Sequence, residues 1–327
     1  MTQKSARKKR RWPRIALGVI VVAGVAVALV LRSPSPVGHW NSADGYEDYL
    51  AKYDQAMKDL PAPALTRDIR TQYGLVRVYR FTGKGNPGTA PLVLLPGTSS
   101  GTPVWADNLP SLLRIGDVYT LDLLGEPGMS IQNRPINTSE DKAAWLDQTL
   151  AALPEKKFNV IGLSIGGWTA ANLALRRPER VATLTTLDAV NVFGGMPVET
   201  IVRSLPAAVK WLPRSWRDSF NSYTAGGAPV EQVPVADMIE SGMKNYTIHQ
   251  SQPERITEQQ LGDLTMPVLA FIAGRSVMHD PPEARRTAES HLRNKTVQFY
   301  PDASHAMNGE YPDQIAADLQ AFLAAHR

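Results

Sequence analysis

The sequence predicts an α/β protein with a doubly wound, mostly parallel sheet and a helical cap. Short apolar runs alternate with longer segments of helical spacing along most of the 327 residues, as in parallel strands joined by crossover helices. Several of these runs are apolar throughout, which is typical of strands buried on both faces. One such run ends in a serine that stands between two glycines.

The first 45 residues differ in composition from the remainder. Residues 1–14 hold seven Lys and Arg side chains and no acidic one, and residues 15–31 hold no charge at all. Cations before an apolar run of this length are typical of a single-pass anchor whose N-terminus stays in the cytoplasm. We therefore predict a basic cytoplasmic tail, a transmembrane helix at 15–31, a polar linker at 32–45 and an extracytoplasmic domain at 46–327. The alternative is a cleaved signal segment, which would leave a secreted protein.

The domain at 46–327 begins with a stretch of helical spacing and continues with short strands. Apolar runs predict strands at residues 75–81, 91–97, 118–125, 158–164, 181–189, 267–274 and 296–302. Helices are expected between most of them, at 141–153, 166–177 and 281–292. Reactive residues of such a sheet lie on loops past the carboxyl ends of the strands.

Residues 190–265 form a segment that is too long for a single crossover. The segment is rich in aromatic residues and prolines, and so many aromatics argue against disorder. Long inserts in compact domains usually have a function. We predict a helical cap over the carboxyl edge of the sheet.

The composition excludes several classes of site. The chain has no cysteine, so it has no disulfide and no zinc site built on thiolates. The six histidines show no metal-ligand spacing, and we expect no metal and no cofactor. The net charge of +4 comes from the basic tail. Because no basic stripe interleaved with aromatics runs through the body, we expect no nucleic-acid partner.

Gly162-Leu163-Ser164-Ile165-Gly166 joins a predicted strand to a predicted helix. A serine in such a turn often has a positive φ, and a side chain at either glycine would collide with the neighbouring strand or helix. The turn directs the Ile165 amide and the helix N-terminus toward an oxyanion that forms beside the serine. Ser164 is therefore the candidate nucleophile; a plain βα turn is the competing interpretation.

A nucleophilic serine needs a base. His305 follows the last predicted strand and precedes the C-terminal helix, which places it at the same sheet edge as Ser164. We predict that His305 accepts the proton of Ser164.

Together these motifs resemble the α/β-hydrolase superfamily from about residue 74 to the C-terminus. The segment "LPGTSSG" after one strand and "DLLGEPGMS" after the next add to the resemblance. It implies the chain order serine, acid, histidine, and a cap inserted after the sixth strand of the family pattern. It also implies that the amide of Thr98, after Pro96-Gly97, is the second oxyanion donor beside Ile165.

The acid is the point where the sequence departs from the family pattern. The family usually places Asp or Glu shortly after the glycine that ends the seventh strand, where this chain has Ser276 and Val277. Neither can orient an imidazolium. Asp280 lies a few residues further and is the favoured candidate. Asp188, just past the preceding strand, is the alternative.

These residues predict a serine hydrolase that acts on small ester-like substrates through an acyl-enzyme, most simply a carboxylesterase. The catalytic residues are Ser164, His305 and Asp280, or Asp188 in its place. A non-catalytic binding or scaffold protein that kept the fold is the alternative, because the usual acid position holds no carboxylate.

Overall fold

The computed structural model describes residues 35–85 and 89–326. The fold is that of the compact unit Val37–Arg327. The sequence-predicted anchor at 15–31 lies outside the described residues. No helix of the described part is both long enough and apolar enough to cross a bilayer. The sequence-based prediction of a single-pass, membrane-anchored protein with an extracytoplasmic catalytic domain is therefore wrong for the part of the chain that the structure describes.

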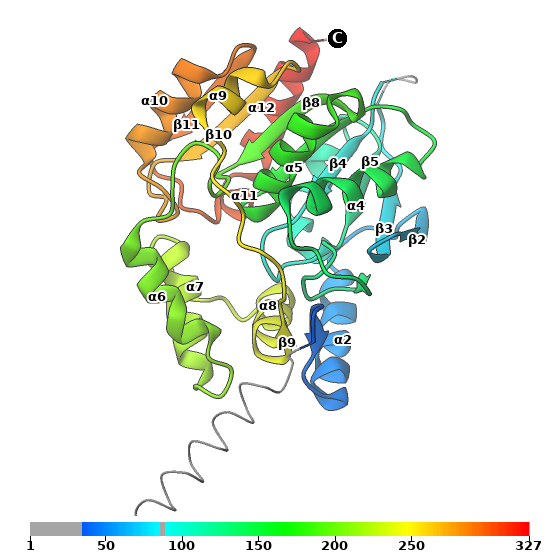
Figure 1. Ribbon diagram of the computed structural model, residues 1–327, viewed down its shortest axis with the longest axis vertical. Coiled ribbons are helices and arrows are strands. Elements are labelled where there is room, and N and C mark those ends of the chain that lie inside the picture. The colour runs from blue at the N-terminus through cyan, green and yellow to red at the C-terminus, as the bar shows by residue number, and fades with distance from the viewer. Residues whose placement is uncertain (1–34, 86–88, 327) are drawn as a thin grey trace, which may run out of the picture. The chain divides into compact units, whose positions relative to one another are not determined.

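A large mixed sheet forms the centre of the unit (Figure 1). Its strands run in the spatial order β11-β10-β8-β7-β4-β5-β3-β2, with the short β6 paired to β3. The pairs from β11 to β5 are parallel, whereas β3 is antiparallel to β5, β2 and β6. The strand bounds are β1 His39–Trp40, β2 Leu65–Thr71, β3 Gly74–Phe81, β4 Leu92–Leu95, β5 Val118–Leu121, β6 Ile131–Gln132, β7 Phe158–Leu163, β8 Val181–Leu187, β9 Tyr246–Thr247, β10 Val268–Ala273 and β11 Lys295–Tyr300.

Helices cover both faces of the sheet, as the strand–helix alternation predicts. The α-helices are α2 Ala43–Met57, α3 Leu109–Leu112, α4 Ser139–Ala151, α5 Ile165–Arg176, α6 Val198–Ala208, α7 Arg214–Thr224, α8 Pro234–Asn245, α9 Glu258–Asp263, α10 Pro281–His291, α11 Met307–Glu310 and α12 Pro312–Ala325. The 3-10 helices η1 Thr102–Trp105 and η2 Pro178–Arg180 complete the set. The predicted α/β-hydrolase architecture is therefore confirmed.

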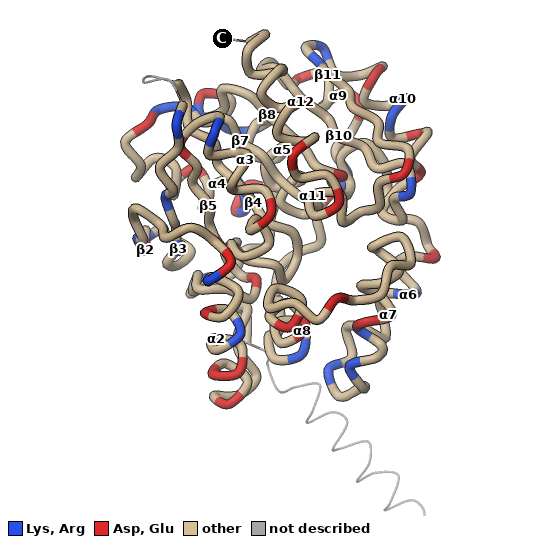
Figure 2. Tube along the Cα trace, turned by 180° about the vertical axis from the view of Figure 1, so that it is seen from behind, with Lys and Arg blue, Asp and Glu red and all other residues tan. Residues whose placement is uncertain are grey.

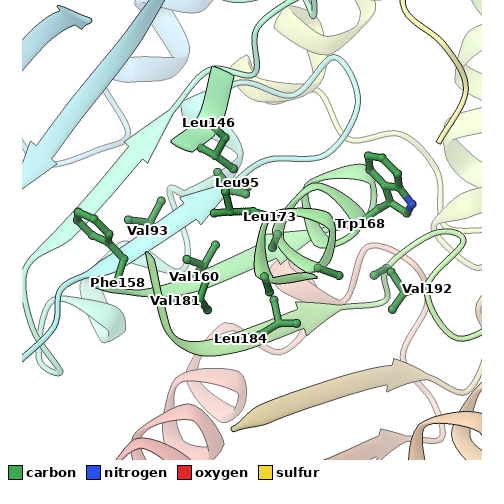
Figure 3. Close-up of a cluster of buried hydrophobic side chains, with 14 of the residues drawn as sticks. Val93, Leu95, Leu146, Phe158, Val160, Trp168, Leu173, Val181, Leu184 and Val192 are labelled. Carbon is green, nitrogen blue, oxygen red and sulfur yellow. The ribbon is translucent and has the colours of Figure 1, made fainter. Parts of the chain in front are cut away.

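The core lies in two layers, one on each face of the sheet. One layer packs strand residues against α4, α5 and α10, and the other packs the opposite strand face against α3 and α12. Figure 3 shows part of the first layer, in which Leu173 of α5 faces side chains of β4, β7 and β8, whereas Trp168 lies on the side of the helix where Val192 is found. Every residue of β4 and of β7 is buried, because both faces of these two strands lie in the core.

The segment between β8 and β10 forms α6, α7, α8, β9 and α9. Helices α6 to α8 lie at one end of the sheet, while α9 packs against α10 beside the strands (Figure 1). Helix α2 packs against α8, and β1 pairs with β9, so the beginning of the domain supports the insert. Basic and acidic side chains are interspersed along the trace (Figure 2).

Candidate active site

Ser164 lies in the turn between β7 and α5 with a φ of 55°. Two close approaches hold the turn. A Cβ at Gly162 would lie 2.1 Å from the Gly166 carbonyl oxygen, and a Cβ at Gly166 would lie 2.2 Å from that of Leu95. Only glycine fits at either position, so the strained conformation of Ser164 is imposed by its neighbours.

The loop after β4 lies against this turn. A Cβ at Gly97 would be 3.6 Å from the Cβ of Ser164. Thr98 and Ile165 both line one cavity of about 150 Å³ beside the turn. Ile165 is the first residue of α5, where an amide has no partner inside the helix. The two predicted oxyanion donors thus border the same space.

His305 reaches Ser164 from the loop between β11 and α11. Its Nε2 lies 2.9 Å from the Ser164 Oγ, and its Nδ1 lies 2.6 Å from Oδ2 of Asp188. The His305 amide donates to the carbonyl of Thr224 at the end of α7, which ties the histidine loop to the insert. Serine, imidazole and carboxylate therefore form one chain of contacts.

Asp188 directly follows β8 and has a φ of 44°. Its carboxylate is fully buried. Oδ1 accepts from the Ala273 amide at 3.1 Å, and Oδ2 accepts from the Ser276 hydroxyl at 2.6 Å. Burial alone raises the pKa of Asp188, but the neighbouring His279 and His305 more than offset this and hold that pKa well below its usual range. The carboxylate therefore stays ionised at neutral pH.

Asp280, the favoured acid from the sequence, lies elsewhere. It is exposed, and its carboxylate accepts from the Glu283 amide at 2.8 Å as the N-cap of α10. The structure thus brings Asp188, rather than Asp280, to His305. The physical reason is that the first turn of α10 needs a capping acceptor at Asp280 and directs that side chain to solvent.

Ser276 and His279 are two site residues that sequence reasoning did not assign. Ser276 stands where the family usually has its acid, and its hydroxyl donates to Asp188 at the end of the neighbouring strand. His279 is buried, and its Nε2 lies 3.2 Å from Oδ1 of Asp188 without the alignment of a hydrogen bond. Strands β8 and β10 are adjacent and parallel, so a polar residue shortly after β10 can reach Asp188 at the end of β8. The polar residues Ser276 and His279 in that loop were therefore the available sequence signal for these contacts.

Charged groups also line the cavity beside the oxyanion amides. Glu126 and Lys142 both border it. Burial raises the pKa of Glu126 to about 7, against the opposing effects of the Ser99 amide and of Lys142. Within the described residues, no group of three or more His, Asp and Glu side chains is arranged to hold a metal ion.

Known proteins are similar to most of this chain. Residues 90–312 match the family model of the alpha/beta hydrolase fold. The chain is 24% identical to an uncharacterized carboxylesterase (nap) and 22% identical to carboxylesterase YbfK, both of Bacillus subtilis. These matches cover 85% and 84% of this chain and 92% and 93% of the relatives.

Solved structures show the same fold. The naproxen esterase of Bacillus subtilis (carboxylesterase NP) superposes with a TM-score of 0.78 at 22% identity, over 86% of this chain and 99% of that one. The family model, which spans more than half of the chain, identifies the protein as a member of the α/β-hydrolase family.

Proposed function

We propose that the protein is a serine hydrolase that cleaves carboxylic esters through an acyl-enzyme. The observation that supports this most strongly is the contact chain from Ser164 through His305 to Asp188, at 2.9 and 2.6 Å. The names of the two carboxylesterase relatives support esters as the substrate class.

The mechanism follows from the roles that this geometry permits. His305 Nε2 takes the Ser164 proton as Oγ attacks the ester carbonyl, and Asp188 stabilises the imidazolium that forms. The amides of Ile165 and Thr98 donate to the oxyanion. His305 then protonates the leaving alcohol, and afterwards activates the water that releases the acid.

Asp188 also bears on the alternative of a non-catalytic member of the fold. That alternative depended on Ser276 and Val277 standing where an acid is usual. The buried carboxylate of Asp188 contacts His305 and can orient the imidazole from the neighbouring strand. The missing acid at residues 276 and 277 is therefore no longer an argument against catalysis.

A series of p-nitrophenyl esters from acetate to octanoate tests the proposed function. We expect saturable release of p-nitrophenol, with an initial burst wherever deacylation is slower than acylation. A well-folded protein that hydrolyses none of these esters above the uncatalysed rate would contradict the proposal.

A further inference from the structure

A charged cavity adjoins the oxyanion amides and has no role in the mechanism above. Its volume is about 150 Å³. Besides Thr98 and Ile165, its walls include the buried side chains of Glu126 and Lys142. A substrate whose carbonyl accepts hydrogen bonds from the Thr98 and Ile165 amides would therefore lie beside these charged groups.

Lys142 projects into the cavity from α4 and is 6% exposed. Its Nζ donates to the Ser251 carbonyl at 2.5 Å and lies 5.1 Å from the centre of the Trp168 ring. Across residues 35–85 and 89–326, no carboxylate lies within 4 Å of this ammonium, in contrast to the ion pairs formed by other basic side chains. Burial lowers the pKa of Lys142 against the opposing effects of Glu126 and Glu254. A buried ammonium without a direct ion pair is costly, and two of its three donors remain for a ligand.

Glu126 is the only carboxyl group in the wall of this cavity among the described residues, and it is 8% exposed. Its Oε2 accepts from the Ser99 amide at 3.1 Å, in the loop that carries Thr98. The titratable groups that act on it are Lys142 of α4, Tyr49 of α2 and Tyr246 of β9. Because burial raises its pKa to about 7, Glu126 is largely neutral in mildly acidic solution and can then donate its own proton to an acceptor.

A cation and a neutral carboxylic acid in one small cavity form a site for an anion. Lys142 supplies the charge and Glu126 supplies a second donor, while Thr98 and Ile165 mark where the scissile carbonyl lies. A free carboxylate on the substrate meets both groups and supplies the direct ion pair that Lys142 lacks.

We propose that the preferred substrates are esters that carry a free carboxylate, such as monoesters of dicarboxylic acids, and that Lys142 and Glu126 bind this carboxylate. This inference rests on the proposed ester hydrolysis and adds the substrate class to it.

Matched substrates test the inference. Monoethyl adipate carries the carboxylate, and the corresponding monoamide, ethyl adipamate, is nearly isosteric and uncharged. We expect the wild-type protein at pH 6 to show a kcat/KM at least about tenfold higher for the carboxylate ester than for the amide ester.

Lys142→Met should lower this ratio of kcat/KM values by about ten- to a hundredfold, as expected for the loss of a hydrogen bond to a charged group. Lys156→Met, which removes an exposed lysine that does not line the cavity, is the matched control and should keep the wild-type ratio.

The pH dependence of the same ratio in the wild-type protein needs no variant. Below pH 7 Glu126 is protonated, and Lys142 alone sets the charge of the cavity. Above pH 7 the Glu126 carboxylate repels the substrate carboxylate, so the ratio should fall as pH rises through about 7. Glu126→Gln should flatten this fall.

The possible outcomes separate the two proposals. A wild-type ratio near one between pH 6 and 8, with the amide ester hydrolysed, overturns the carboxylate site and leaves the esterase proposal standing. An unchanged ratio in a folded Lys142→Met variant does the same. Failure to hydrolyse either ester or any p-nitrophenyl ester overturns both proposals.

Discussion

Replacing Ser164 by alanine is expected to lower kcat for ester hydrolysis by about 10⁶-fold, the scale seen when a triad nucleophile is removed. Without Oγ no acyl-enzyme can form, and His305 has only water to activate. Initial rates on a p-nitrophenyl ester, with the variant at high concentration, measure the loss.

Ser204→Ala is the matched control for this variant. Ser204 lies on α6 and is half-buried, and its hydroxyl donates to the Ile201 carbonyl of its own helix. We expect its kcat to stay within about twofold of wild type, since surface changes of this kind are near neutral. A Ser164→Ala variant that keeps more than one per cent of the wild-type kcat would show that the hydrolysis takes place elsewhere.

The second large effect distinguishes the two candidate acids. Asp188→Asn should lower kcat by about 10⁴-fold, because an asparagine cannot stabilise the imidazolium and can hold His305 in the wrong tautomer. Asp280→Asn should change kcat by less than about twofold, because asparagine is also a good N-cap for α10. Both variants are compared with one ester under the same conditions.

Thermal melting provides the control for folding in this comparison. Asp188 accepts hydrogen bonds from Ala273 and Ser276, so its variant can lose stability as well as activity, and rates are measured well below its melting temperature. If Asp280→Asn loses more activity than Asp188→Asn, then Asp188 is not the triad acid.

The parts of the site that the sequence predicted depend on local geometry. Ser164 is identifiable because a strand, two obligatory glycines and a helix surround it within a few residues. His305 is identifiable because it follows the last of the parallel strands. Each inference needs only the direction of one strand and the turn that ends it.

The carboxylate that contacts His305 could not be predicted in the same way, because its position depends on two neighbouring strands. Asp188 and Asp280 follow β8 and β10 respectively, and both strands end at the same sheet edge. The choice depends on a positive φ at Asp188 and on the capping need of α10, neither of which the local pattern specifies. The hydroxyl of Ser276, at the usual acid position, is part of the same tertiary arrangement.

The edge strand β2 and the cavity that Glu126 and Lys142 share could not be predicted from local sequence patterns either. Strand β2 is exposed at most positions and carries no apolar run, so its pairing with β3 left no signal in hydropathy. Glu126 follows β5 and Lys142 lies on α4, and only the tertiary packing of these two segments brings both side chains to one cavity.

Covalent labelling is the most direct test of Ser164 as a nucleophile that His305 activates. The protein is incubated with a fluorophosphonate probe, digested and mapped by mass spectrometry. We expect one adduct per chain, on the peptide that contains Ser164, and its loss in both Ser164→Ala and His305→Ala. A folded wild-type protein that stays unlabelled, or an adduct on another residue, would contradict the assignment.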